Sequence, residues 1–254
     1  MNNTNAIKFI SEGISTVSLV KKGDFPTDYN VSLEYSNNGT DWSAWDLSGL
    51  NINSGDTLYI RGNNPSGFNS SPEAYYSFII EGDKVSCSGN IMSLIDYENL
   101  PDVIPNAYCF YGLFEGCTAL KTAPELPAKT LSDWCYAYMF SFCTSLIKAP
   151  ELPAKTLSDW CYAYMFFDCS SLTTAPELPA MKLADSCYYR MLSKCTSLVK
   201  APELPAKTLS DWCYAYMFKD CTSLATTPEL PTTEKLVFCY ESMFSGCTAL
   251  KGEQ

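Results

Sequence analysis

The chain has 254 residues, 17 of them basic and 28 acidic, and a formal net charge of −11. This length allows one or two domains with a substantial core. Both the first 99 residues and the remainder are acidic, so nucleic acid and anionic membrane surfaces would repel each part. The sequence contains no run of eighteen apolar residues. We therefore expect no nucleic-acid partner and no membrane insertion.

Residues 1–92 have the pattern of a β domain. Apolar and polar residues alternate in four stretches bounded by turn residues, at 15–20, 31–35, 57–61 and 75–80. The tripeptide Asn37-Asn38-Gly39 is typical of a hairpin turn, because Asn-Gly supplies the positive φ angles that a tight turn requires. The spacing of these short strands predicts an all-β, sandwich-like domain.

Residues 93–107 are predicted to link this domain to the repeats and to cap the first repeat. Residues 108–254 consist of copies of a 26-residue unit. The phrase LPAKTLSDWCYAYMFxxCTSLxxAPE returns almost unchanged. Its two cysteine columns are Cys109, Cys135, Cys161, Cys187, Cys213, Cys239 and Cys117, Cys143, Cys169, Cys195, Cys221, Cys247. Such a period is typical of a solenoid, in which each unit buries its apolar face against its neighbours.

Within a unit, the spacing predicts a helix followed by a strand. Ser132-Asp133 resembles a helix N-cap, and Cys135, Met139 and Cys143 form an apolar stripe at i, i+4 and i+8. Residues 145–149 are predicted to form a short strand in a parallel ladder. The fold class expected for the chain is therefore α+β, with a sandwich-like domain followed by about six helix-and-strand units.

The cysteines are expected to be buried free thiols. If the stretch between the two columns is helical, each pair is separated by about 12 Å, which is too far for a disulfide. Free cysteine packs as a small hydrophobe, and this usage is typical of a reducing cytosol. Disulfides between repeats are the alternative. The chain has no histidine, and the spacing of the cysteines does not fit a structural zinc site.

The repeat motif resembles a known family. The residues Met139-Phe140, Cys143 and Leu146, with their counterparts in other units, are similar to the leucine-rich repeats of BspA-like surface proteins of Bacteroidales. The resemblance implies a right-handed leucine-rich-repeat solenoid used for adhesion or recognition. Phages of the same hosts encode repeat proteins of this type. Since the N-terminal segment has no secretory signal pattern, we expect a virion protein that folds in the host cytoplasm. The alternatives are a structural decoration or tail component and a bacterial cell-surface adhesin.

Comparison of the repeats with each other separates predicted core from predicted surface. One column is aromatic in every unit, one is apolar in every unit, and both are assigned to the core: Phe110, Tyr136, Tyr162, Tyr188, Tyr214, Tyr240 and Leu113, Met139, Met165, Met191, Met217, Met243. Two further columns are rich in Trp and Tyr and predict a binding stripe on one helix face, with ordinary packing between coils as the alternative. Its candidate residues are Trp134, Tyr138, Trp160, Tyr164, Trp212 and Tyr216. In the β domain, one of Trp42 and Trp45 is expected in the core and the other at the surface, and Trp42 is a candidate sugar-binding residue.

One acidic column, Glu125, Glu151, Glu177, Glu203 and Glu229, is expected to be neutralised by lysines four residues downstream such as Lys129. One carboxylate per unit does not converge as calcium requires, so no metal is expected. The absence of histidine excludes Ser-His and Cys-His nucleophile arrangements, and the chain has no phosphate or dinucleotide motif. We expect a non-enzymatic protein without a cofactor. The expected partners are a protein or cell-surface glycan, other virion proteins, and in homo-oligomers a second copy.

Overall fold

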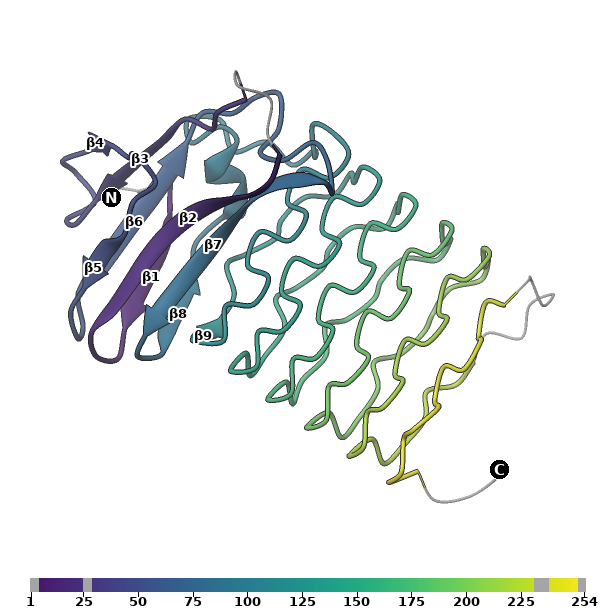
Figure 1. Cartoon of the computed structure of the whole chain (residues 1–254). Coiled ribbons are helices and arrows are strands. Elements are labelled where there is room, and N and C mark those ends of the chain that lie inside the picture. Colours follow the sequence, from purple (N-terminus) through teal and green to yellow (C-terminus); the bar gives the residue numbers. More distant parts are fainter. Residues whose placement is uncertain (1–4, 25–28, 231–237, 251–254) are drawn as a thin grey trace.

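The computed structural model describes residues 5–24, 29–230 and 238–250. Its first part consists of two β-sheets (Figure 1). The strands are β1 Ile7–Ser11, β2 Ser15–Gly23, β3 Leu33–Ser36, β4 Ser43–Ala44, β5 Leu50–Ile52, β6 Thr57–Gly62, β7 Ala74–Gly82, β8 Val85–Ser88 and β9 Leu120–Thr122. One sheet has the order β4-β3-β6-β1-β8-β9 and the other the order β5-β2-β7.

The inner faces of the two sheets share one core. Phe9 of β1 and Phe78 of β7 lie in different sheets, and their ring centroids are 5.5 Å apart. Strands β2 and β7 pair antiparallel over their whole length, from Ser15–Gly82 to Gly23–Ala74. Alternate residues of β2 are buried, as expected for a sheet with one face on the core. A sandwich-like arrangement follows from this packing.

The four strands expected from alternation are present as β2, β3, β6 and β7. The predicted hairpin is confirmed as well, since β3 pairs antiparallel with β4 and Gly39 in the turn between them has φ +77°. Strands β1 and β8 were not among the predicted elements, although they pair with each other in the centre of the larger sheet.

The repeats form a stack of coils, one 26-residue unit per coil, but the units contain no helix. The helical element of the described chain is one short 3-10 turn, Ile91–Leu94. Each coil is instead a succession of β-turns. Ala137 and Met139 donate their N–H groups to carbonyls three residues back, whereas the intervening Tyr138 donates to Ala163 O of the next coil at 3.0 Å. The coils lie side by side in Figure 1.

Backbone dihedrals explain why a helix does not form. The third residue of every second turn has positive φ: in one coil these are Trp134 (+57°), Tyr138 (+58°) and Phe142 (+62°). A type II turn requires positive φ at this place, and a right-handed helix cannot contain it. Residues that point into the core therefore recur every four positions. In an α-helix, residues eight positions apart would differ in direction by about 80°, so they would not point the same way.

The expected α+β fold with a leucine-rich-repeat solenoid was wrong. The protein is nearly all β with two sheets, and the segments predicted as helices are turns. The predicted caps fail with them: Ser132 Oγ donates to Ile104 O and not to its own coil. The strand expected at 145–149 is reduced to single parallel bridges, such as Thr122–Lys148 and Lys148–Thr174.

The two predicted core columns are confirmed except at Tyr240, which is only partly buried. Tyr136 and Tyr162 are 1% exposed, and their rings stack 5.9 Å apart at an interplanar angle of 3°. Met139 and Met165 are fully buried. All thirteen cysteines are buried thiols outside any disulfide. In the second cysteine column each thiol after Cys117 donates to a carbonyl of the preceding coil, as Cys143 does to Phe114 O at 3.1 Å.

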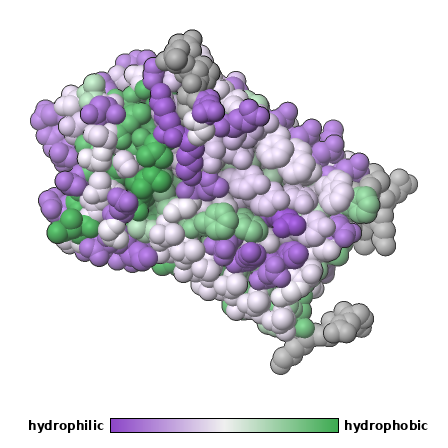
Figure 2. All heavy atoms as spheres, in the orientation of Figure 1, coloured by the Kyte–Doolittle hydropathy of each residue, from purple (hydrophilic) through white to green (hydrophobic). Residues whose placement is uncertain are grey.

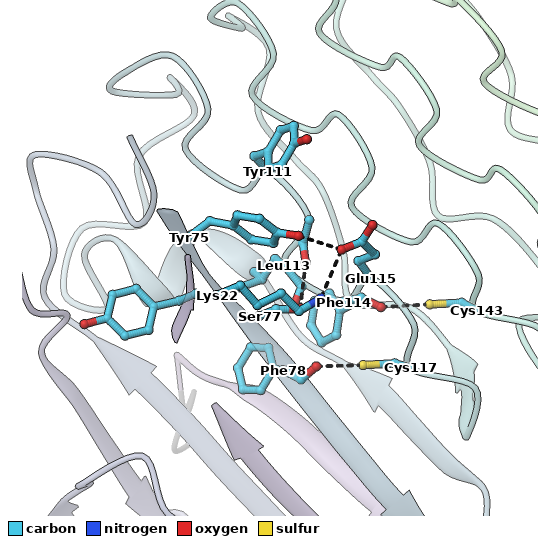
Figure 3. Close-up of polar contacts among 12 residues, drawn as sticks. Lys22, Tyr75, Ser77, Phe78, Tyr111, Leu113, Phe114, Glu115, Cys117 and Cys143 are labelled. Atoms are coloured by element: carbon cyan, nitrogen blue, oxygen red, sulfur yellow. Dashed lines mark hydrogen bonds and ion pairs between the residues drawn. The ribbon is translucent and has the colours of Figure 1, made fainter. Parts of the chain in front are cut away.

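The β domain takes the place of a coil before the first repeat (Figure 3). Cys117 Sγ donates to Phe78 O at 3.1 Å, and Ser77 Oγ donates to Gly112 O at 2.8 Å. At the same junction Glu115 Oε2 accepts from Tyr75 at 2.7 Å and from Lys22 Nζ at 3.0 Å. Strand β9 of the first repeat also pairs in parallel with β8, so one hydrophobic core runs through both parts.

Candidate functional site

A row of half-buried aromatic rings runs along the stack of coils. We call it the aromatic strip. Its members are Tyr75, Tyr108, Tyr111, Trp134, Tyr138, Trp160, Tyr164, Tyr189, Trp212, Tyr216 and Phe238. Six of these are the binding residues predicted from the repeat columns. The strip therefore brings those six residues together on one surface.

The rings contact each other across coils and not along one coil. Trp134 stacks on Trp160 with centroids 4.5 Å apart and an interplanar angle of 4°. Tyr138 stacks on Tyr164 at 4.5 Å and 10°. The expectation that Trp134 meets Tyr138 on one helix face was wrong, because the segment that contains both residues is a series of turns. Since the flat faces of these rings cover each other, the strip presents mainly ring edges and hydroxyl groups to a ligand.

Tyr189 keeps the strip continuous where the repeat changes. In the fourth unit, Ser186 stands where the units on either side have Trp160 and Trp212, and Arg190 stands where they have Tyr. Tyr189 replaces the alanine of neighbouring units, and its ring lies 5.3 Å from Trp160 and 5.7 Å from Tyr216. Sequence comparison of the columns missed Tyr189, and the signal that could have revealed it is that Tyr replaces the alanine of this column there and at Tyr111 of the first unit.

Most strip residues from the two predicted columns have positive φ, which aromatic side chains adopt reluctantly. Trp160 has φ +58°, Tyr164 +55° and Tyr216 +56°. The first unit has Gly112 at the corresponding place, with φ +57°. Glycine, which lacks Cβ, adopts this positive φ without steric cost. The aromatic side chains at the same place in other units are therefore present in spite of a conformational cost. We take this as a sign that the strip has a role beyond filling the turn.

A pair of substitutions at Tyr138 tests this backbone effect. Tyr138→Gly is expected to be more stable than Tyr138→Ala by about 1 kcal/mol, because glycine enters the left-handed region without steric cost. Urea unfolding of both variants measures the difference. As a control, Ala163→Gly, at a residue outside the positive-φ set, should lose roughly 0.5–1 kcal/mol. If Ala is the more stable residue at 138 as well, the positive φ is wrong.

The strip has hydroxyl groups that stay protonated and cations beside them. The pKa of Tyr138 is raised to about 12, chiefly because the hydroxyl is buried and secondly because Tyr111 lies close to it. Burial also raises the pKa of Tyr111 to about 12. Arg190 lies over the ring of Tyr216, 4.5 Å from its centroid, and Lys194 lies 5.2 Å from that of Phe167. At neutral pH the surface therefore offers neutral hydroxyls and positive charges.

Trp42, predicted as a sugar-binding residue, lies away from the strip in the β domain. The Arg61 guanidinium carbon is 3.8 Å from the centre of the Trp42 ring and 3.9 Å from that of Tyr97. Arg61 also forms an ion pair with Glu34 at 2.8 Å. One face of Trp42 is thus occupied by a cation, while Trp45 is buried, as expected. This cluster fits a structural role in the sheet edge.

The acidic column lines a second set of features, a row of open hollows between successive Pro-Glu-Leu-Pro loops. The hollow between the loops of Glu177 and Glu203 has a volume of about 570 Å³. The expected pairing of Lys129 with this column was wrong, because Lys129 pairs with Asp102 at 3.5 Å. In the described residues, no group of three or more His, Cys, Asp or Glu side chains is placed to hold a metal ion.

Figure 2 shows that hydrophobic residues on one face of the molecule gather over the strands of the β domain, while the coils there are mostly near neutral in hydropathy. Over the described ranges, the structure has no helix of the length and apolar character needed to cross a membrane. Comparison with family models, with curated proteins and with solved structures finds no match to the chain. These comparisons leave the resemblance to BspA-like proteins untested.

Proposed function

We propose that the chain is a non-enzymatic recognition or attachment protein and that the aromatic strip binds a partner protein. The observation that carries this proposal is the continuity of the strip, which Tyr189 maintains across the fourth unit, where the Trp and Tyr of the two adjacent units are absent. Tyr, Trp and Arg are the residues most enriched in the energetic centres of protein interfaces.

The geometry favours a protein over a glycan as ligand. Sugar rings bind aromatic side chains through exposed ring faces, whereas Trp134 and Trp160 cover each other's faces at 4.5 Å. Ring edges and hydroxyls such as that of Tyr138 suit the mixed polar and apolar contacts of a protein surface. Arg190 adds a cation that can bind a carboxylate of the partner.

We propose further that the protein is exposed on the virion of a phage of Bacteroidales and contacts the host surface or other virion proteins. The resemblance of the Met-Phe, Cys, Leu motif supports this proposal. The rival, a structural virion component, predicts binding to virion proteins and none to cells. A bacterial adhesin predicts the protein on uninfected cells.

Binding of the labelled full chain to intact Bacteroidales cells tests the proposal. Trp160→Ser and Tyr216→Ser place at these positions the residue that the chain itself has at Ser186 and Ser242. Each variant is expected to bind at least about tenfold more weakly, as loss of an interface centre requires. Glu177→Gln, in the loops away from the strip, is the matched control and should bind as the unmodified chain does.

Equal binding by both serine variants, with circular dichroism unchanged, would remove the strip as the binding surface. Saturable binding that all three variants retain would mean that another face of the protein binds the partner. Absence of binding by the unmodified chain would favour the structural rival.

A further inference from the structure

The fourth unit places an arginine in the middle of the aromatic strip. Arg190 stands where the adjacent units have Tyr164 and Tyr216. Its guanidinium carbon lies 4.5 Å from the centre of the Tyr216 ring, 5.7 Å from that of Tyr189 and 5.9 Å from that of Tyr164. Three rings of the strip therefore surround one positive charge.

Arg190 has hydrogen-bonding capacity that the described part of the chain does not use. No carboxylate among the described residues forms an ion pair with it, and its Nε is buried without a hydrogen-bond acceptor. Arg61 of the β domain makes the contrast clear, because it also lies against two rings but pairs with Glu34 at 2.8 Å. A guanidinium has five N–H donors in a planar fork that matches a carboxylate.

Two lysines lie over rings beside Arg190. Lys194 Nζ is 5.2 Å from the centre of the Phe167 ring, and Lys219 Nζ is 5.7 Å from that of Tyr216. The two lysines lie on adjacent coils, since Lys194 N–H donates to Lys219 O at 2.8 Å. We call Arg190, Lys194 and Lys219 the cationic patch.

The acids nearest in sequence register do not neutralise this patch. Asp168 and Asp220 stand in the column of Lys194, but neither forms an ion pair with a residue of the patch within the described ranges. Asp220 extends toward the next coil, because a Cβ added to Gly246 would lie 2.1 Å from Asp220 Oδ1. Three cations against two carboxylates leave the patch positive in a chain of net charge −11.

Packing alone does not require a cation here. A tyrosine in this column can stack on the tyrosine of the next coil, as Tyr138 does on Tyr164 at 4.5 Å. Arg190 interrupts that stack and leaves one buried donor without an acceptor, which costs about 1–3 kcal/mol. The arginine therefore has a property that the tyrosines lack, and that property is its charge.

We infer that the partner presents an acidic peptide segment to the cationic patch, with a Glu or Asp carboxylate against Arg190. The inference rests on the proposed function, because it names the chemistry of the partner that the strip binds. The rings provide apolar contact on both sides of the carboxylate, and the guanidinium provides charge-assisted hydrogen bonds. At about 0.15 M salt the Debye length is about 8 Å, so the distant acids of this chain repel such a segment only weakly.

Titration of the full chain with two blocked peptides tests the inference. Acetyl-LELEL-amide carries carboxylates and acetyl-LQLQL-amide does not, and neither contains an aromatic residue. Tryptophan fluorescence reports binding, because Trp160 and Trp212 lie 5.3 Å and 6.3 Å from Tyr189. The glutamate peptide is expected to bind at least about tenfold more tightly than the glutamine peptide, as loss of a charge-assisted hydrogen bond requires.

Variants of Arg190 identify the residue responsible. Arg190→Tyr restores the residue of the adjacent units and removes the charge, so it should bind both peptides equally. Arg190→Gln should do the same without adding a ring. Lys200→Gln is the matched control: it also removes one positive charge, but Lys200 lines the hollow between the loops of Glu177 and Glu203. This variant should keep the full preference for the glutamate peptide.

Equal affinity of the unmodified chain for the two peptides, or no binding of either, overturns the inference. A preference that survives in Arg190→Tyr and Arg190→Gln, with circular dichroism unchanged, also overturns it. If acetate binds as tightly as the glutamate peptide, the patch binds a free carboxylate and not a peptide. The proposed function is tested separately: loss of cell binding in Trp160→Ser without any peptide preference would keep the strip as the binding surface and remove only its acidic partner.

Discussion

Raising the pH from 8 to about 10.5 is expected to unfold the protein. Burial raises the pKa of Cys117, Cys109 and Cys221 to about 12, and it raises those of Cys143 and Cys169 well above the ordinary value of 9.0. The folded chain therefore keeps protons that the unfolded chain releases above pH 9. For such groups stability is complete below the unfolded pKa and falls as the pH rises toward the folded pKa.

The size of the effect follows from the number of thiols. Each buried thiol contributes a loss of about 1.4 kcal/mol per pH unit above its unfolded pKa. With twelve buried cysteines whose pKa is raised, the loss one unit above that pKa is on the order of 10 kcal/mol or more, which is comparable with the whole stability of a typical domain. Buried tyrosines such as Tyr214, whose pKa is also raised by burial, add to it at higher pH.

Far-ultraviolet circular dichroism against pH, in the presence of a reductant, measures this transition. Return to pH 7 should restore the signal, which separates proton release from oxidation or hydrolysis. A thiol reagent at pH 8 gives an independent check: Cys169 and its neighbours should react only after denaturation. A native spectrum that persists at pH 11 would contradict the burial of the thiols.

Replacement of one buried phenylalanine in the repeat column that contains Phe140 is expected to have the second largest effect on stability. Phe140 is fully buried and stacks between Phe114 at 5.5 Å and Phe166 at 5.6 Å. Phe140→Ala is expected to lower the free energy of unfolding by about 3–5 kcal/mol, because it leaves a cavity between two coils. In a repeat stack this loss uncouples the coils on either side. Urea unfolding measures both the stability and the cooperativity.

The last coil provides the matched comparison. Phe244 occupies the same column, is half-buried, and stacks on Phe218 alone among the described residues, at 5.7 Å. Phe244→Ala should therefore cost less than half as much as Phe140→Ala. Equal losses would mean that stacking between coils does not determine the stability of the repeat.

The sequence predicted correctly which repeat columns are buried, but it did not predict the backbone conformation of the segments that contain them. A column such as that of Tyr136 or Met139 is conserved in register from unit to unit within this chain, and burial follows from that repetition alone. The helix prediction failed because apolar residues at Cys135, Met139 and Cys143 suit both a period of 3.6 and a period of four. The sequence carries no signal for positive φ at Trp134, where neither Gly nor Asn stands.

In the β domain, the backbone conformation was predicted in part. Strands with clear alternation, such as β2 and β7, were predicted, whereas β1 and β8 are short and were not. The hydrogen bonds that join the two parts, from Asn69 and Ser77 to carbonyls of the first coil, come from loop and strand residues with no periodic pattern. The six predicted strip residues were found from their columns, but Tyr189 depends on a substitution that only the structure connects to its neighbours.

The backbone hydrogen bonds between the turn segments of successive coils, such as those of Trp134 and Tyr138, run toward the next coil and give the stack an electrostatic direction. The peptide unit between Asp133 and Trp134 accepts at its carbonyl from Tyr108 N and donates from its N–H to Asp159 O, so its dipole lies along the stack. Every second peptide unit of these turns is oriented in the same sense, and aligned peptide dipoles add. The resulting macrodipole has its positive end at the last coil. An α-helix has its positive end at its N-terminus, whereas this stack has it at the C-terminal side. We expect this dipole to weaken the repulsion of anionic groups on the C-terminal side of the described coils at low ionic strength.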